Sequence, residues 1–191
     1  MKKTLLTLAV LATAASVFAQ GTVMFTGLNS ANGVNWKVFQ ADGTTALSGA
    51  NYFAQLLSSP GLDQSAGFVA GTPTTTFRTG SGAGYIALTT VTLANVAKDS
   101  TGGATVMAVA WDNTSGLYPT WAEAGVAWQE GKIAAGMGPW LNVSAKIGGD
   151  LTTPPFLTGM QGFNISIVPE PSSLALAGLG AAAMLIFRRR K

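Results

Sequence analysis

The 191-residue sequence contains no cysteine and no histidine, and only 10% of its residues are charged. Without cysteine no disulfide bond can form, so packing must stabilise the protein in an oxidising compartment. Without histidine the chain lacks the commonest general base, the commonest ligand of transition metals and the usual partner of a serine or cysteine nucleophile. We therefore predict that the protein has no metal site and no cofactor.

The few charges that are present are distributed unevenly along the chain. Two of the 11 cations lie within the first three residues and four occupy the last four positions, whereas residues 20–168 carry five cations and seven carboxylates. The formal net charge of +3 therefore comes from the two ends, and the central part carries five minus seven, or −2. Because this part has no basic patch, we do not expect a nucleic acid as partner.

The N-terminal residues have the parts of a secretory signal peptide. A basic start, Met1-Lys2-Lys3, precedes an apolar run rich in Leu, Ala and Val, and Val17-Phe18-Ala19 then offers a cleavage site. This order is typical of exported proteins. We predict that residues 1–19 are a signal peptide and that the mature chain begins near Gln20.

The C-terminal residues have the composition of a short membrane helix with a basic stop. Residues 174–187 are uncharged, and with the two preceding serines the segment is roughly 24 Å long as a helix, where a typical bilayer core needs about 30 Å. Positive residues resist translocation, and four follow the segment: Arg188, Arg189, Arg190 and Lys191. We predict a membrane helix of marginal length with these cations on the cytoplasmic side.

The same segment resembles a known sorting signal. The triplet Pro169-Glu170-Pro171, two serines, an apolar run and a terminal arginine cluster follow one another as in the PEP-CTERM signal of exported proteins of Gram-negative bacteria. The resemblance implies export by the secretion machinery, transient insertion in the inner membrane and recognition by exosortase, a membrane protease-transpeptidase. It also implies cleavage near the triplet and delivery to the cell surface or to an extracellular matrix of exopolysaccharide. Residues 169–191 would then be the sorting signal of an exosortase substrate.

Residues 20–168 have the length and pattern of a single β-rich domain. Apolar and polar residues alternate at 34–38, 141–147 and 163–167, and we expect further strands at 21–28, 52–57, 84–93 and 104–111. Frequent turn residues separate these segments. The predicted fold class is all-β, a single β-sandwich of Greek-key or jelly-roll type with one short helix.

The expected helix covers residues 121–130. Thr120 and Glu123 have the spacing of a capping box, apolar residues follow at helical spacing, and Gly131 is a stop signal. The body also resembles an uncharacterised domain of exported PEP-CTERM proteins in the segments LSGANYFAQLL, FRTGSGAGYIALTTVTL and VMAVAWDNTSG. That resemblance implies no chemical activity.

Candidate functional side chains gather between residues 111 and 140. Carbohydrate-binding surfaces use exposed aromatic rings, and the candidates for stacking on a sugar are Trp121, Trp128 and Trp140, whereas Trp36 and Trp111 lie in strand patterns of the core. Glycoside hydrolysis needs two converging carboxyl groups, for which the candidates are Asp112, Glu123 and Glu130. The plainer interpretation, which we favour, is that Asp112 forms a turn, Glu123 caps the helix and Glu130 is solvated.

Two further groups of residues have both a possible binding role and a possible structural role. Asp99, Asp112, Asn113 and Asp150 offer oxygen ligands for calcium, but no alternating acidic run is present and single aspartates in turns usually cap their own backbone. Arg78 precedes a glycine-rich loop without a following helix, so a structural role is favoured over anion binding.

The functional prediction is an exported, non-enzymatic surface or matrix protein that associates with exopolysaccharide. The alternative is a carbohydrate-binding module or a carbohydrate-active enzyme that uses residues 111–140.

Overall fold

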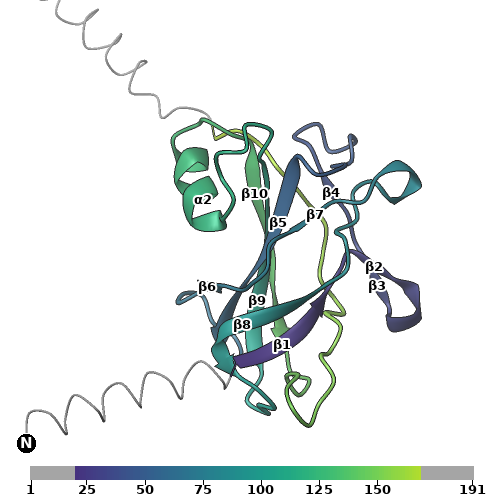
Figure 1. The fold of residues 1–191 in the computed structure, drawn as a ribbon, viewed down its shortest axis with the longest axis vertical. Helices are drawn as coiled ribbons and strands as arrows, with labels where there is room; N and C mark the ends of the chain where they lie inside the picture. Colours follow the sequence, from purple (N-terminus) through teal and green to yellow (C-terminus); the bar gives the residue numbers. More distant parts are fainter. Residues whose placement is uncertain (1–19, 169–191) are drawn as a thin grey trace, which may run out of the picture.

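The computed structural model describes residues 20–168, and its largest sheet is antiparallel throughout (Figure 1). Strand β9 (Ala104–Asp112) lies between β10 (Ala135–Val143) and β5 (Tyr52–Pro60). Strand β5 also pairs with two short strands, β6 (Val69–Ala70) and β7 (Thr75–Thr76). Because β5 and β9 pair over all nine of their residues, they form the structural centre of the molecule.

A second antiparallel ribbon consists of β1 (Gln20–Phe25) and β8 (Thr89–Ala97), and it crosses the large sheet (Figure 1). The remaining elements are short: an antiparallel pair, β2 (Leu28–Asn29) with β3 (Val34–Asn35); a parallel pair, β4 (Val38–Phe39) with β11 (Phe163–Asn164); and two 3-10 turns, η1 (Ser30–Asn32) and η2 (Gly80–Gly82). The expected β-rich fold with one α-helix is confirmed for the described residues, and the β-sandwich of Greek-key or jelly-roll type stays a prediction.

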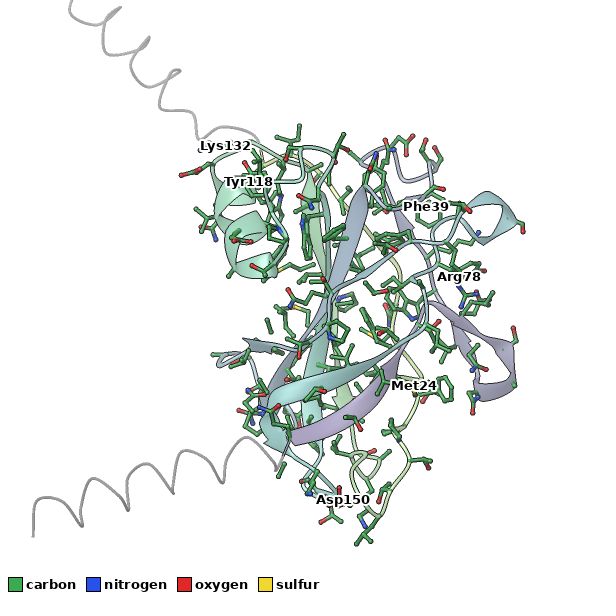
Figure 2. All side chains as sticks on the ribbon, viewed as in Figure 1. Met24, Phe39, Arg78, Tyr118, Lys132 and Asp150 are labelled. Atoms are coloured by element: carbon green, nitrogen blue, oxygen red, sulfur yellow. The ribbon has the colours of Figure 1, made fainter. Side chains whose placement is uncertain are left out.

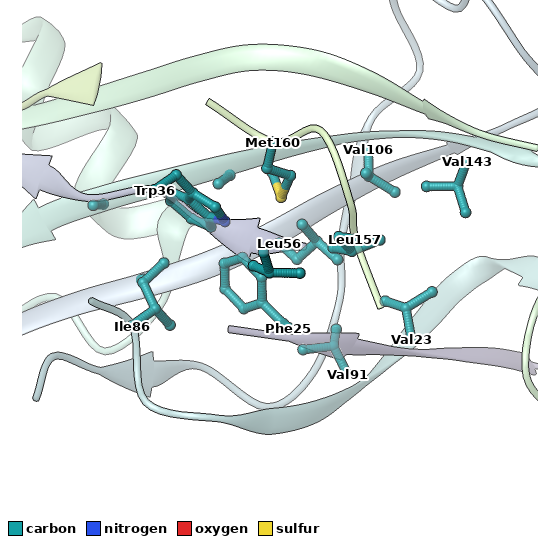
Figure 3. Packing of buried hydrophobic residues seen from close by; sticks show 14 of the residues in the cluster. Val23, Phe25, Trp36, Leu56, Ile86, Val91, Val106, Val143, Leu157 and Met160 are labelled. Atoms are coloured by element: carbon teal, nitrogen blue, oxygen red, sulfur yellow. The ribbon is translucent and has the colours of Figure 1, made fainter. Parts of the chain in front are cut away.

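The main hydrophobic core lies between the large sheet and the β1–β8 ribbon (Figure 3). Among its fully buried side chains are Val23, Phe25, Leu56, Ile86, Val91 and Val106. Alternate residues of β9 point to the other face of the sheet, where Val109 and Trp111 belong to a second cluster. Burial on both faces explains why this strand shows no alternation of apolar and polar residues.

The helix α2 (Trp121–Gln129) covers part of that second face and has the predicted capping box. Ala124 is fully buried against Trp111 and its neighbours, and Gly131 adopts a left-handed φ of 70° beyond the helix end. The buried side chain of Gln55 fixes the helix start, because its Oε1 accepts the Trp121 N–H at 2.9 Å while its Nε2 donates to the Gly71 carbonyl at 2.8 Å. The helix prediction is confirmed.

Strand β10 differs from the strand expected at 141–147. It begins six residues earlier, at Ala135, and ends at Val143, and its pairing with β9 shifts between Met137 and Trp140. The bulge at this shift contains Gly138 and Pro139, which interrupt the alternation and conceal the strand in the sequence. Proline is tolerated because β10 is the edge strand of the sheet.

Three other expected strands are shifted or interrupted. The strand expected at 84–93 runs from Thr89 to Ala97, and Ile86 makes only an isolated bridge. The segment 34–38 is divided between β3 and β4, and regular pairing in 163–167 ends at Asn164. Alternation reports which side chains are buried, whereas regular pairing also requires a neighbouring strand in register, and that depends on the whole fold.

The predicted signal peptide (1–19) and the predicted membrane helix and sorting signal (169–191) lie outside the described residues. Between residues 20 and 168, no helix is long and apolar enough to cross a membrane.

Candidate functional site

The five tryptophans occupy three different environments. Trp36 and Trp111 are buried in the two clusters, as their strand patterns predict. The ring of Trp36 stacks on Phe163 with centroids 6.4 Å apart, and the indole N–H of Trp111 donates to the Tyr118 carbonyl at 2.8 Å. Neither ring is available to a ligand.

Trp121 and Trp128 are half-buried members of an aromatic series that starts in the second cluster. Ring centroids are 5.8 Å apart for Phe53 and Trp111, 5.9 Å for Trp111 and Trp121, and 5.9 Å for Trp121 and Trp128. The indole N–H of Trp128 also donates to the Ser166 carbonyl at 2.8 Å. Both side chains therefore hold the helix and the C-terminal segment in place, and their stacking on a sugar stays a prediction.

Trp140 is separate from this series and is 51% exposed. It lies opposite Met107 in the pairing of β10 with β9, whereas Trp111 lies opposite Ala135. Met107 and Trp111 are four positions apart on β9, so Trp140 lies about 13 Å along the strand from the level of Trp111. Beside Trp140 on the same face, Met137 is 48% exposed. The structure therefore does not combine the three candidate rings in one platform.

A polar network lies on the same face of the sheet as Trp140, two residues further along β10, where Asn142 is opposite Thr105. The Nδ2 of Asn142 donates to Asp63 Oδ1 at 2.6 Å, and the Asp63 N–H donates to Asn142 Oδ1 at 2.9 Å. The buried Thr105 hydroxyl lies 3.1 Å from Asn142 Oδ1 and donates to the Gly61 carbonyl at 2.9 Å. The Gln64 N–H donates to Thr105 Oγ1 at 3.1 Å. Sequence reasoning missed this network because its hydrogen-bonded partners are 37 to 79 residues apart.

The three carboxylates proposed for hydrolysis each have a local structural task. Asp112 Oδ1 accepts the Thr114 N–H at 2.8 Å, and Glu123 Oε2 accepts the Thr120 N–H at 3.0 Å in the capping box. Glu130 pairs with Lys132 at 2.7 Å, and this hydrogen bond raises the pKa of the lysine. The turn and capping roles predicted for Asp112 and Glu123 are confirmed.

The calcium candidates form two pairs, Asp112 with the adjacent Asn113 and Asp99 with Asp150. Asp99 accepts the Asp150 N–H at 3.0 Å, and Asp150 pairs with Lys98. Burial acts to raise the pKa of Asp99, but hydrogen bonds from Thr152 and from the backbone outweigh it and lower that pKa. Figure 2 shows Asp150 at the end of the molecule opposite Lys132. Across residues 20–168, no three carboxylates gather in a potential metal site.

Arg78 donates from Nη2 to Thr26 Oγ1 at 3.4 Å, and its side chain packs against Gly82 (Figure 2). These contacts agree with the structural role favoured from the sequence.

A small pocket lies beside the C-terminal end of the described chain. It has a volume of about 160 Å³ and is lined by Gln40, Tyr52, Asp112 and Ser166 among others. Burial, and then the charge of Asp112, raise the pKa of Tyr52, whose hydroxyl lies 3.3 Å from Gln40 Nε2. Ligand sites usually have volumes of about 300–1,000 Å³, so this pocket is smaller than a typical site for a small molecule.

The comparison with protein families bears on the C-terminus. Residues 168–191 match the PEP-CTERM protein-sorting motif. The resemblance predicted from the triplet, the apolar run and the basic tail is therefore confirmed, and the chain carries the signal of an exported precursor that exosortase sorts to the cell surface. No curated protein and no solved structure matches the sequence. The similarity of the body to an uncharacterised exported domain stays a prediction.

Proposed function

We propose that the chain is a non-enzymatic component of the cell surface or of an exopolysaccharide matrix, which exosortase releases from the inner membrane. The observation that carries the proposal is the sorting motif at residues 168–191, which follows the part of the chain that the structure describes. On this proposal the domain between residues 20 and 168 is the delivered product.

The C-terminal end of the domain supports this division. Ser166 exchanges two backbone hydrogen bonds with Ala135, at 3.0 and 3.2 Å, and Pro169 follows only three residues later. Three residues span at most about 11 Å. Among residues 20–168 every buried core residue precedes Ser166, so cleavage near Pro169 would leave this packed core complete.

The described carboxylates support a non-enzymatic role. Asp112, Glu123 and Glu130 are each engaged in a turn, a helix cap or an ion pair, as described above. Hydrolysis of a glycoside requires two carboxyl groups on either side of one bond, about 5 to 10 Å apart. The second candidate function, carbohydrate binding, is favoured by one observation, the exposed ring of Trp140.

Intact mass spectrometry of the protein recovered from the producing cells tests the proposal. We expect a delivered form that begins near Gln20 and ends near Pro169. A variant with both prolines of the triplet changed to alanine is the matched control, and it should stay in the membrane fraction with Lys191 present.

Two results would refute the proposed function. A delivered wild-type protein that still ends at Lys191 would indicate a permanent membrane anchor. Release of reducing sugars from a panel of polysaccharides would show that the domain is an enzyme, and loss of that release on changing Glu123 or Asp112 would locate its site.

A further inference from the structure

We propose that the face of the large sheet around Trp140 is a binding site for a neutral, hydroxyl-rich polysaccharide chain. The ring of Trp140 would stack on one sugar, and the Asp63–Asn142 pair would bind the hydroxyl groups of the same sugar or the next. This inference rests on the proposed function, because it identifies the matrix component that the delivered domain would hold.

The bulge in β10 explains why Trp140 faces outward. Met137 lies opposite Val109 and Trp140 lies opposite Met107. The chain therefore advances three positions along β10 for two positions along β9. In a regular strand, residues three positions apart point to opposite faces, so a β10 without this register shift would turn either Met137 or Trp140 toward the main core. The bulge thus places two large apolar side chains on one exposed face, where they are 48% and 51% exposed.

The adjacent polar groups are already held in position. Asn142 follows Trp140 by two residues on the same face, at about 6 to 7 Å along the strand. Its amide is fixed by two hydrogen bonds with Asp63, a residue with an unusual left-handed φ of 56°. Within the described chain the Asp63 Oδ2 accepts no hydrogen bond, so a carboxylate oxygen and the second amide hydrogen of Asn142 remain available to a ligand. Pre-positioned groups lose little conformational entropy on binding.

The composition of this face favours a sugar over a protein partner. A stable protein interface uses about 20 to 30 residues a side, whereas here two exposed apolar side chains adjoin hydrogen-bonding groups. An aromatic ring beside fixed hydrogen-bonding groups matches a sugar, which has an apolar CH face and polar edges. The negative charge of Asp63 would repel uronic acids, so the expected ligand is neutral.

Native gel electrophoresis in the presence of a polysaccharide tests the site with the delivered protein recovered from cells. We expect dextran or galactomannan to retard the wild-type protein and alginate to leave its mobility unchanged. Trp140→Ala should weaken the retardation at least about tenfold. Leu117→Ala is the matched control, because Leu117 is a 69% exposed apolar residue elsewhere, and it should bind like the wild type.

Tryptophan fluorescence gives a second measurement that does not require Trp140→Ala to fold. Addition of the retarding polysaccharide should shift the wild-type emission to shorter wavelength, and this shift should be absent in Trp140→Phe. The inference is wrong if neither neutral polysaccharide retards the wild type, if alginate alone does so, or if Trp140→Ala is retarded equally. A protein that is processed and non-hydrolytic but not retarded would refute this site alone, whereas retained Lys191 or hydrolysis would refute the proposed function.

Discussion

Glycines along β10 allow the C-terminal segment to pack directly against the edge of the large sheet. An ideal Cβ at Gly136 would lie 2.3 Å from the Asn164 carbonyl oxygen, and one at Gly138 would lie 2.8 Å from the ring of Phe163. Atoms do not approach so closely without displacement of one chain. These two residues are therefore required by packing and not by a turn.

Gly136→Ala tests this close approach. Because the obstructing atom belongs to the backbone of Asn164, the substitution should lower the free energy of unfolding by about 1–3 kcal/mol in urea denaturation. The control is Gly102→Ala, where the nearest atom is Ser100 Oγ at 3.6 Å, and it should be neutral or stabilising by up to about 1 kcal/mol. Equal effects of the two substitutions would contradict the interpretation.

Asp42 gives the folded state a dependence on acid pH. Its carboxylate accepts hydrogen bonds from the Thr45 hydroxyl and from the N–H groups of Thr44 and Thr45, which lower its pKa from 3.8 to about 2. Because the folded-state pKa lies below the unfolded-state value, the charged form is stabilised in the folded state. This contribution is complete above about pH 4 and is lost as the pH falls toward 2.

Asp42→Ala should therefore reduce stability at pH 6 and have a smaller effect at pH 2. Urea denaturation of the variant and the wild type at both pH values measures the two differences. A difference that stays constant between pH 6 and pH 2 would show that the charge of Asp42 makes no contribution.

At the scale of elements, the helix α2 connects the second cluster to the C-terminal segment. Its Trp121 packs on Trp111, and its Trp128 holds the Ser166 carbonyl through the indole N–H. The segment that leads to the sorting motif is thereby fixed between the helix and β10.

Trp128→Phe should loosen that segment, because phenylalanine retains a ring but lacks the donor. A net loss of about 1 kcal/mol corresponds to roughly fivefold faster hydrogen exchange at the Ser166 amide. The control is Trp140→Phe, since no hydrogen bond of the Trp140 indole is formed in the part of the chain that the structure describes. An unchanged rate of hydrogen exchange at the Ser166 amide in Trp128→Phe would show that the Trp128 indole N–H does not hold the C-terminal segment in place.

At the scale of the whole molecule, sorting changes the charge of the protein. After removal of residues 1–19, nine cations face eight carboxylates, for a net charge of +1. Loss of the chain from Pro169 onward leaves five cations and seven carboxylates, for a net charge of −2. The basic pI of about 9.4 thus belongs to the precursor.

Isoelectric focusing should therefore show a basic membrane-bound form and an acidic delivered form. The variant with both prolines of the triplet changed to alanine should remain entirely basic. An acidic form in that variant, or a basic delivered form of the wild type, would contradict removal of the arginine cluster.

The sequence by itself determined the features that depend on neighbouring residues. The capping box at Thr120 and Glu123, the turn at Asp112, and the sorting signal from Pro169 to Lys191 each need only a few adjacent positions. The burial of Trp36 and Trp111 also followed from local strand patterns. Local hydrogen bonds and local apolar periodicity are visible without knowledge of the fold.

Only the tertiary structure decided the features that join distant residues. The bulge that presents Trp140, the contact of Asp63 with Asn142 across 79 positions and the link from Gln55 to Trp121 depend on which strands become neighbours. Strand register is set by pairing over the whole sheet, and a shift of one residue turns a side chain to the opposite face. For this reason the sequence could identify Trp140 as a candidate for stacking on a sugar, but only the fold showed that it lies apart from Trp121 and Trp128.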